Sequence, residues 1–168
     1  MPQPSIQESH LTGTHASRTA SQGMVRNLLF GGATVDSAAA DLGLLATRVI
    51  VGLSLAFAHG IGKMPPSEGF IGGVGAMGMP APETFAWLGG FAEFGGGILL
   101  ALGLFTRPIA LLICGHMLVI TLLAHAGDPF GDRELAVIYG AVALLYLLVG
   151  AGRYSIDRLL RERNAAPR

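Results

Sequence analysis

Charged residues are scarce in this chain, and their scarcity excludes an ordinary soluble domain. Aspartate, glutamate, lysine and arginine together make up 13% of the 168 residues, whereas hydrophobic residues make up 51%. Globular proteins carry roughly 25% charged residues, and about half that share is too little to cover a compact soluble surface. The formal net charge is zero, so no basic excess points to a nucleic-acid partner. The composition instead favours a protein whose partner is the lipid bilayer.

Cysteine is almost absent as well. Cys114 is the single cysteine, so the chain can form neither an internal disulfide nor a paired-cysteine redox centre of the vitamin K epoxide reductase kind. His116 and His125 are nine residues apart and therefore lie on opposite faces of a helix. We accordingly predict no metal site and no covalently bound cofactor.

Long apolar segments are what the chain has in quantity. Four follow one another, at residues 42–64, 83–105, 107–126 and 134–150. A helix needs about 20 residues to cross a bilayer core about 30 Å thick, and these segments lack the alternation of a membrane β-strand. We therefore expect an all-α, polytopic membrane protein whose four transmembrane helices form a bundle within residues 42–152.

Basic residues set the expected orientation, because segments rich in lysine and arginine stay in the cytoplasm. With four spans, both termini and the turn after the second span share one side. That side holds nine arginines, whereas Lys63 and Arg133 lie on the other. We expect cytoplasmic N and C termini, with a disordered arm at residues 1–40 and a basic amphipathic tail at residues 153–168.

The segment between the first two spans, residues 65–82, mixes prolines and glycines with scattered apolar residues. Such a segment cannot continue a helix, yet it is too apolar to float in water, so we expect it on the outer membrane surface. Two interpretations stay open: a lid over a site, or an apolar connector. Arg48, near the inner end of the first span, is expected to snorkel to the lipid headgroups.

Glu93 is a carboxylate in the middle of the second span. It lies about 15 Å from the outer end of that segment by helical rise, and ionisable residues at such depth usually face a bundle interior. Other polar side chains belong to the same outer half of the bundle. The expected site consists of His59, Lys63, Glu93, His116 and Tyr139.

Small residues indicate which face of the second span is buried. Gly89, Glu93 and Gly97 follow one another at four-residue intervals with Gly96 beside them, and Gly52 belongs to a similar stripe on the first span. Glycines at this spacing let helix backbones approach closely, so Glu93 should face a neighbouring helix. Glu93 then either fixes helix register through a buried ion pair or hydrogen bond, or accepts protons in a ligand-binding site.

Several motifs, in order along the chain, resemble the DoxX family of small bacterial membrane proteins. They are AHGIGK at 58–63, EFGGGILLALGLFTR at 93–107, GHML at 115–118 and GAGRYSID at 150–157, with Arg48 ahead of them. The resemblance implies a four-helix protein of the bacterial inner membrane. It also implies a link to quinones or oxidative stress, because members resemble a thiosulfate:quinone oxidoreductase subunit, quinone-detoxification proteins or membrane anchors of oxidative-stress enzymes.

Two functions follow as expectations. In the first, the chain is a quinone-associated redox subunit: His59 or Lys63 donates a hydrogen bond to the quinone, Glu93 is the catalytic proton carrier, and a soluble or membrane redox partner supplies electrons. In the second, the chain is a non-catalytic scaffold that recruits soluble redox or oxidative-stress enzymes. A small transporter ranks third, because four short helices leave little room for an aqueous path. Each of these functions is compatible with a homo-oligomer.

Overall fold

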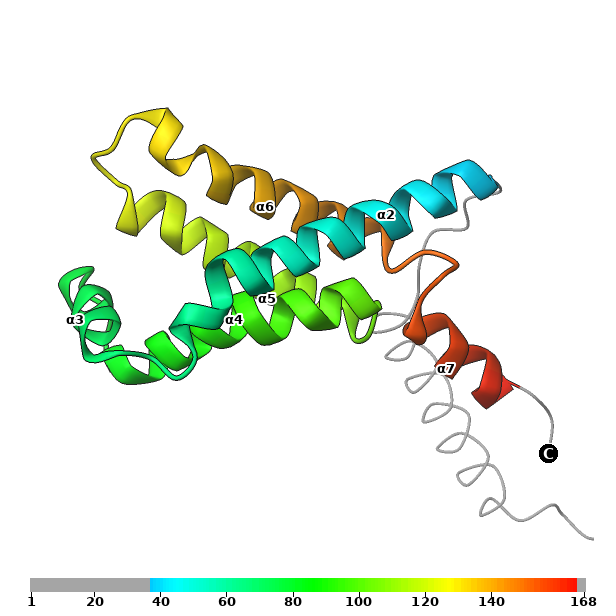
Figure 1. The fold of residues 1–168 in the computed structure, drawn as a ribbon, viewed down its shortest axis with the longest axis horizontal. Coiled ribbons are helices and arrows are strands. Elements are labelled where there is room, and N and C mark those ends of the chain that lie inside the picture. Colours follow the sequence, from blue (N-terminus) through cyan, green and yellow to red (C-terminus); the bar gives the residue numbers. More distant parts are fainter. Residues whose placement is uncertain (1–36, 166–168) are drawn as a thin grey trace, which may run out of the picture.

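The computed structural model describes residues 37–165, and the regular structure within them is helical throughout (Figure 1). In chain order the elements are α2 (Ala38–Ser54), η1 (Leu55–Gly60), η2 (Ile61–Lys63), α3 (Glu68–Ala76), α4 (Pro82–Leu102), α5 (Thr106–Val119), η3 (Ile120–Ala124), α6 (Phe130–Val149) and α7 (Ile156–Ala165). The segments η1 and η3 are π-helical, and η2 is a short 3₁₀ turn.

Four long helices form the bundle. The first is continuous through α2, η1 and η2, and η3 likewise extends α5. Helix α4 packs against both α2 and α5, and α5 packs along α6. Tyr146 of α6 links this helix back to α2, because its hydroxyl donates a hydrogen bond of 2.6 Å to the carbonyl of Leu44. Helix α3 lies at one end of the bundle and α7 at the other (Figure 1).

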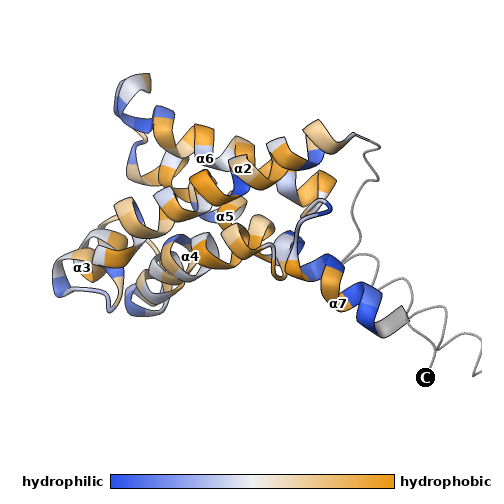
Figure 2. Ribbon diagram, turned by 45° about the vertical axis from the view of Figure 1, so that its right-hand side comes forward, coloured by the Kyte–Doolittle hydropathy of each residue, from blue (hydrophilic) through white to orange (hydrophobic). Residues whose placement is uncertain are grey.

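Three helices in the described part of the chain are long and apolar enough to cross a membrane: Ala38–Lys63, Pro82–Leu102 and Thr106–Ala124. Apolar residues cover the outside of the bundle, with large side chains such as Ile50, Leu118 and Leu148 exposed (Figure 2). The expected all-α membrane bundle is confirmed. Helix α6 has 20 residues but begins with the charged run 132–134, and its crossing of the membrane stays a prediction.

The first helix begins before the predicted start of its span. Ser37 caps α2 by accepting a 3.4 Å hydrogen bond from the backbone N–H of Ala40. Residues 38–40, which we assigned to the disordered arm, are therefore helical. The rest of that prediction concerns residues 1–36, which lie outside the described residues, as do residues 166–168 of the predicted tail.

A helix occupies part of the segment 65–82, contrary to our expectation. The Ser67 side chain accepts a 3.2 Å hydrogen bond from the N–H of Phe70 and so caps α3. Val74 is buried, and α3 packs on α4. The prolines lie before this cap and after the last helical residue, at positions 65, 66, 80 and 82. They limit the helix without interrupting it.

Helices α2 and α4 cross in close contact at Gly52 and Gly97. A Cβ atom on Gly52 would lie 2.5 Å from the carbonyl oxygen of Gly97, and one on Gly97 would lie 2.6 Å from that of Gly52. Only glycine permits so short a separation of backbones. Gly96 meets Ile113 of α5 at an ordinary contact distance, and Gly89 faces the imidazole ring of His116.

Arg48 is fully buried, so the prediction that it snorkels to headgroups is wrong. Its Nε donates to the carbonyl of Ala101 at 3.2 Å, its Nη2 donates to that of Tyr154 at 2.6 Å, and its Nη1 donates to that of Ala151. Carbonyls at helix ends lack partners within their own helix, and a guanidinium carries several donors in a rigid fork. These carbonyls therefore hold the guanidinium inside the bundle.

Two aspartates complete this end of the bundle. Asp157 accepts hydrogen bonds from the backbone N–H groups of Phe105 at 2.8 Å and Thr106 at 2.9 Å, which start α5. Asp41 accepts one from the N–H of Arg153 at 3.2 Å. We call Asp41, Arg48 and Asp157 the arginine cluster. It joins the motif at 150–157 to α2 and to the α4–α5 turn.

Candidate functional site

Glu93 stands at the centre of a buried polar group at the α3 end of the bundle. Lys63 Nζ donates to both carboxylate oxygens, at 2.7 Å to Oε1 and 2.6 Å to Oε2. His116 Nε2 lies 2.9 Å from Oε1. Glu93 is 1% exposed, and a carboxylate buried to this degree is stable only when it is paired. We call Lys63, Glu93 and His116 the glutamate cluster.

Three different helices supply this cluster. Lys63 ends the first helix, Glu93 lies midway along α4, and His116 belongs to α5. Gly60 lies directly against the backbone of Glu93 and Phe94, and a Cβ on Gly90 would lie 2.7 Å from the carbonyl oxygen of Lys63. These glycines let the end of the first helix reach α4. Lys63 is therefore close enough to pair with the carboxylate.

The other two predicted site residues lie beside the cluster. The rings of His59 and Tyr139 meet edge to face, with centroids 5.5 Å apart and an interplanar angle of 75°. Both line the same cavity as Glu93 and Lys63. The structure thus brings all five predicted residues to one end of the bundle, as a charged trio and an adjacent aromatic pair.

Two π-helical segments lie at this end and were not predicted. In a π-helix each carbonyl bonds five residues ahead, which shifts the register of the side chains, and such turns occur frequently at functional sites. The segment η1 carries His59, and η3 carries Ile120. We treated both as regular helix, because hydropathy alone does not distinguish the two helix types.

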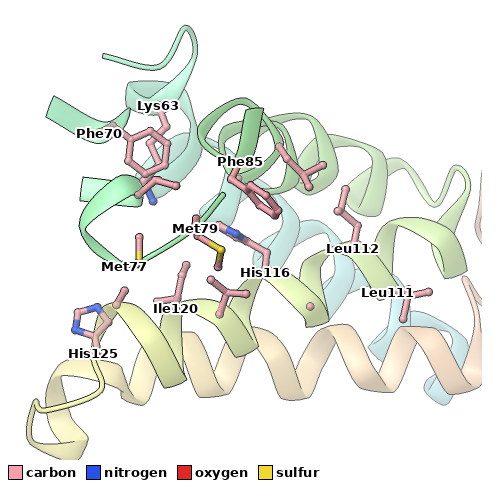
Figure 3. Close-up of a pocket in the computed structure, with 16 residues that line it drawn as sticks. Lys63, Phe70, Met77, Met79, Phe85, Leu111, Leu112, His116, Ile120 and His125 are labelled. Carbon is pink, nitrogen blue, oxygen red and sulfur yellow. The ribbon is translucent and has the colours of Figure 1, made fainter. Parts of the chain in front are cut away.

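An apolar cavity of about 600 Å³ adjoins the cluster. Phe70 and Met77, from the α3 segment, lie on one side of it, and Leu112, His116 and Ile120 of α5 and η3 lie on the other (Figure 3). Lys63 and His116 provide the polar groups of its wall near Glu93. Helix α3 therefore covers a cavity, which favours the lid interpretation of the segment 65–82.

A smaller, polar cavity of about 190 Å³ lies on the other side of the cluster. Its ionisable or hydroxyl-bearing residues are His59, Lys63, Glu93, His125, Asp132 and Tyr139. Glu93 lines this cavity and not the apolar one, whereas His116 lines the apolar cavity and not this one. The Glu93–His116 hydrogen bond thus joins the two cavities.

Several lining residues escaped the sequence analysis. Phe70 places its ring 5.6 Å from Lys63 Nζ in a cation–π contact, and Met77, Met79 and Phe85 line the apolar cavity. Flexible methionines are common at binding surfaces, so the two in residues 65–82 were an available signal. Asp132 carried no such signal, because its place in the cavity that Glu93 also lines depends on how α6 packs.

Within residues 37–165, no group of three or more histidine, cysteine, aspartate or glutamate side chains is placed to hold a metal ion. The polar groups that converge are a carboxylate, an ammonium and an imidazole. Together they can donate hydrogen bonds to an uncharged ligand and carry protons.

The fold and this buried cluster define a class: a polytopic membrane protein with an ionisable site inside a helical bundle. The family model DoxX matches residues 43–126. The chain belongs to the DoxX family.

Three relatives support the assignment. The chain is 32% identical to inner membrane protein YqjF of Escherichia coli over 127 residues, which cover 73% of this chain and 95% of that protein. It is 30% identical to inner membrane protein YphA of the same organism, covering 68% of this chain and 88% of YphA. It is also 30% identical to a Bacillus subtilis protein named "Putative oxidoreductase CatD", covering 70% and 86%. No solved structure matches the chain significantly. The chain is thus a multi-pass protein of the inner membrane.

Proposed function

We propose that the chain is a quinone-associated redox subunit whose ligand occupies the apolar cavity. The observation that carries this proposal is the buried glutamate cluster, whose Lys63 and His116 lie in the wall of that cavity. Small-molecule sites are typically about 300–1,000 Å³, mostly apolar, with a few convergent polar groups. A cavity of about 600 Å³ with Lys63 and His116 at one wall has these properties.

The chemistry of a quinone matches the groups present. Its apolar ring suits the aromatic and methionine side chains, and its carbonyl oxygens accept hydrogen bonds. Lys63 and His116 donate to such an oxygen, and Glu93 supplies protons through His116. Reduction to the quinol consumes two electrons and two protons, and the electrons come from a partner protein that carries a redox group. The oxidoreductase in the name of the Bacillus relative is consistent with this class of chemistry.

A thermal melt in detergent, with and without a short-chain ubiquinone, tests the proposal. A ligand that binds only the folded state raises the melting temperature, so quinone should stabilise the wild type and fail to stabilise Glu93→Gln. Glu83→Gln is the matched control, because it changes an exposed glutamate in the first turn of the same helix. The control should respond like the wild type.

The opposite result would change the assignment. If quinone does not change the melting temperature of the wild type, and Glu93→Gln only lowers the melting temperature of the protein, the cluster is structural. The scaffold function then takes the lead, and α7 is the segment that favours it. Leu159 is exposed on this helix, beside an Arg158–Glu162 ion pair of 2.6 Å. Such a surface suits a membrane face or a recruited enzyme.

The proposed orientation places the α3 end of the bundle, with both cavities, on the outer side of the membrane. It follows from the nine arginines on the side of the termini. Reporter fusions at the C-terminus check it: a cytoplasmic reporter should be active and a periplasmic one inactive. The reverse activities would invert the orientation while leaving the quinone proposal intact.

A further inference from the structure

The two cavities differ in chemistry although they share a wall. Six of the eleven residues around the smaller cavity are ionisable or carry a hydroxyl, whereas three of the sixteen around the larger one are. Lys63, Ile120 and His125 line both cavities. Each cavity therefore offers Glu93 and His116 a different environment.

The polar cavity reaches the surface of the bundle at its α6 side. Asp132, at the start of α6, is exposed, and His125, before the turn that leads to α6, is partly exposed. A water molecule occupies about 30 Å³ of liquid and needs polar partners in a cavity. A volume of about 190 Å³ among these residues has room for several waters.

We propose that the polar cavity is a water-filled proton path to Glu93, separate from the apolar cavity that admits the ligand. The use of the path rests on the proposed function, whereas its existence does not. The imidazole of His116 is the link between the two compartments. Its Nε2 meets Glu93, and within the described residues its Nδ1 has no hydrogen-bond partner.

The proton transfer restores Glu93 to its starting state but leaves His116 as its other tautomer, with the proton on Nε2. The waters of the polar cavity relay a proton from the bulk solvent to Glu93, Glu93 passes a proton to His116 Nε2, and His116 releases the proton on Nδ1 to a ligand oxygen. Imidazole suits this relay because it exchanges protons at two separate nitrogens. A half-turn of the imidazole ring then exchanges the two nitrogens and restores the starting tautomer, and one proton has moved from the polar cavity to the ligand. Lys63 holds the carboxylate in place through both of its oxygens.

Cysteine accessibility in membrane vesicles tests the path without any quinone. The background is Cys114→Ser, which removes the single native thiol. Ala136→Cys and Leu135→Cys place a thiol at the polar cavity, and Leu112→Cys places one at the apolar cavity. Leu144→Cys is the control, on an exposed position of α6 outside both cavities. The reagents are a small cationic methanethiosulfonate and the uncharged N-ethylmaleimide.

The two compartments should differ in their reaction with the charged reagent. The thiolate is the reactive form of a thiol, and it forms readily only where water reaches it. The thiols introduced at positions 135 and 136 should therefore react at least about tenfold faster with the cationic reagent than the thiol introduced at position 112. Asp132→Asn should slow that reaction, because it removes a negative charge from the cavity. N-ethylmaleimide should modify the thiol at position 112.

Either of two results would overturn the proposal. If positions 135 and 136 react no faster than the control at 144, the cavity is dry. If position 112 reacts as fast as 136 with the cation, the two cavities form a single aqueous cleft. Neither result bears on the quinone melt. If quinone does not raise the melting temperature but the thiols react as expected, the water path is supported and the quinone proposal is rejected.

Discussion

Both ends of the bundle bury charged side chains, but they satisfy those charges in different ways. In the arginine cluster, Arg48 and Asp157 bond almost entirely to backbone carbonyls and N–H groups. In the glutamate cluster, Lys63, Glu93 and His116 bond to one another. Backbone partners are fixed by the fold, whereas side-chain partners can exchange protons and turn toward a ligand. The first arrangement suits a structural contact between helices, and the second suits a ligand-binding site.

The surroundings of the two ends support the same distinction. Lys63 is about a third exposed in its side chain, and His116 is 15% exposed, because both face cavities. Arg48 is 1% exposed, and its donors close the joint between α2, α4 and the chain after α6. Variants of the arginine cluster should therefore change stability alone. Variants of the glutamate cluster should also change the response to quinone.

Arg48→Met should have the largest effect on stability. It leaves the carbonyls of Ala101, Ala151 and Tyr154 without their donor, and removing one partner of a buried charged group costs about 3–5 kcal/mol. The melting temperature in detergent should fall by about 10 °C or more. Arg107→Met is the control, because Arg107 bonds a single carbonyl, that of Leu148, and it should cost about 1 kcal/mol.

Arg48→Lys sharpens this test. An ammonium lacks the rigid fork that reaches several carbonyls at once, so lysine should rescue little of the loss. A full rescue would mean that charge alone is needed at this position. The rigid fork of the guanidinium would then not be what holds this joint together.

A double-mutant cycle should show that the side chains of the glutamate cluster stabilise one another. Lys63→Met leaves the buried carboxylate without its cation and should cost about 3 kcal/mol, the lower end of the range for a broken buried pair, because Lys63 is partly exposed. Lys63→Met with Glu93→Leu should recover at least about 1 kcal/mol of that loss. Quinone should stabilise neither variant. Free energies of unfolding measure the coupling between the two side chains, and thermal melts with quinone measure the response to the ligand.

Additive losses in this cycle would contradict the interpretation. They would mean that Lys63 and Glu93 contribute independently, and that the short distances between them carry little coupling. A double variant that still responds to quinone would place the ligand elsewhere.

The same substitution, glycine to alanine, at one position in each end of the bundle distinguishes the two ends. Gly103 has φ +66°, and a Cβ there would lie 2.6 Å from Arg48 Nη1, so Gly103→Ala should cost about 1–3 kcal/mol. A Cβ on Gly89 would lie 2.9 Å from His116 Cε1, and the imidazole can move. Gly89→Ala should therefore cost about 1 kcal/mol or less but reduce the quinone-induced shift in the melt. If the two variants lost equal stability and responded equally to quinone, the two ends of the bundle would not differ in function.

The sequence predicted the bundle well because hydropathy over about 20 residues reports directly on the bilayer. The five predicted site residues meet at one end because depth along a helix follows from position by simple rise. Helix α3 was missed, since its glycines and flanking prolines masked a Ser67 cap. Arg48 was misplaced because its acceptors come from positions 101, 151 and 154, and no local pattern reports contacts so distant in sequence.

The cavities show the same limit. Which wall each side chain faces depends on the π-helical registers of η1 and η3 and on the position of α3. A pattern of apolar residues contains none of this information. That Glu93 lines one cavity and His116 the other is therefore visible only in the three-dimensional structure.

Asp157→Asn should have the smallest effect and is the most demanding test of the comparison. An asparagine keeps one side-chain oxygen as acceptor for the N–H groups of Phe105 and Thr106 but loses the charge-assisted part of those bonds, and changes at helix N-termini cost about 0.5–2 kcal/mol. We expect a loss near the lower end, about 0.5–1 kcal/mol. The quinone-induced shift in the melt should match that of the wild type, because Asp157 belongs to the opposite end of the bundle from Glu93. If this small change weakened the quinone response, the start of α5 would transmit strain along that helix to His116. The two ends would then be one coupled unit, with the arginine cluster setting the geometry of the site.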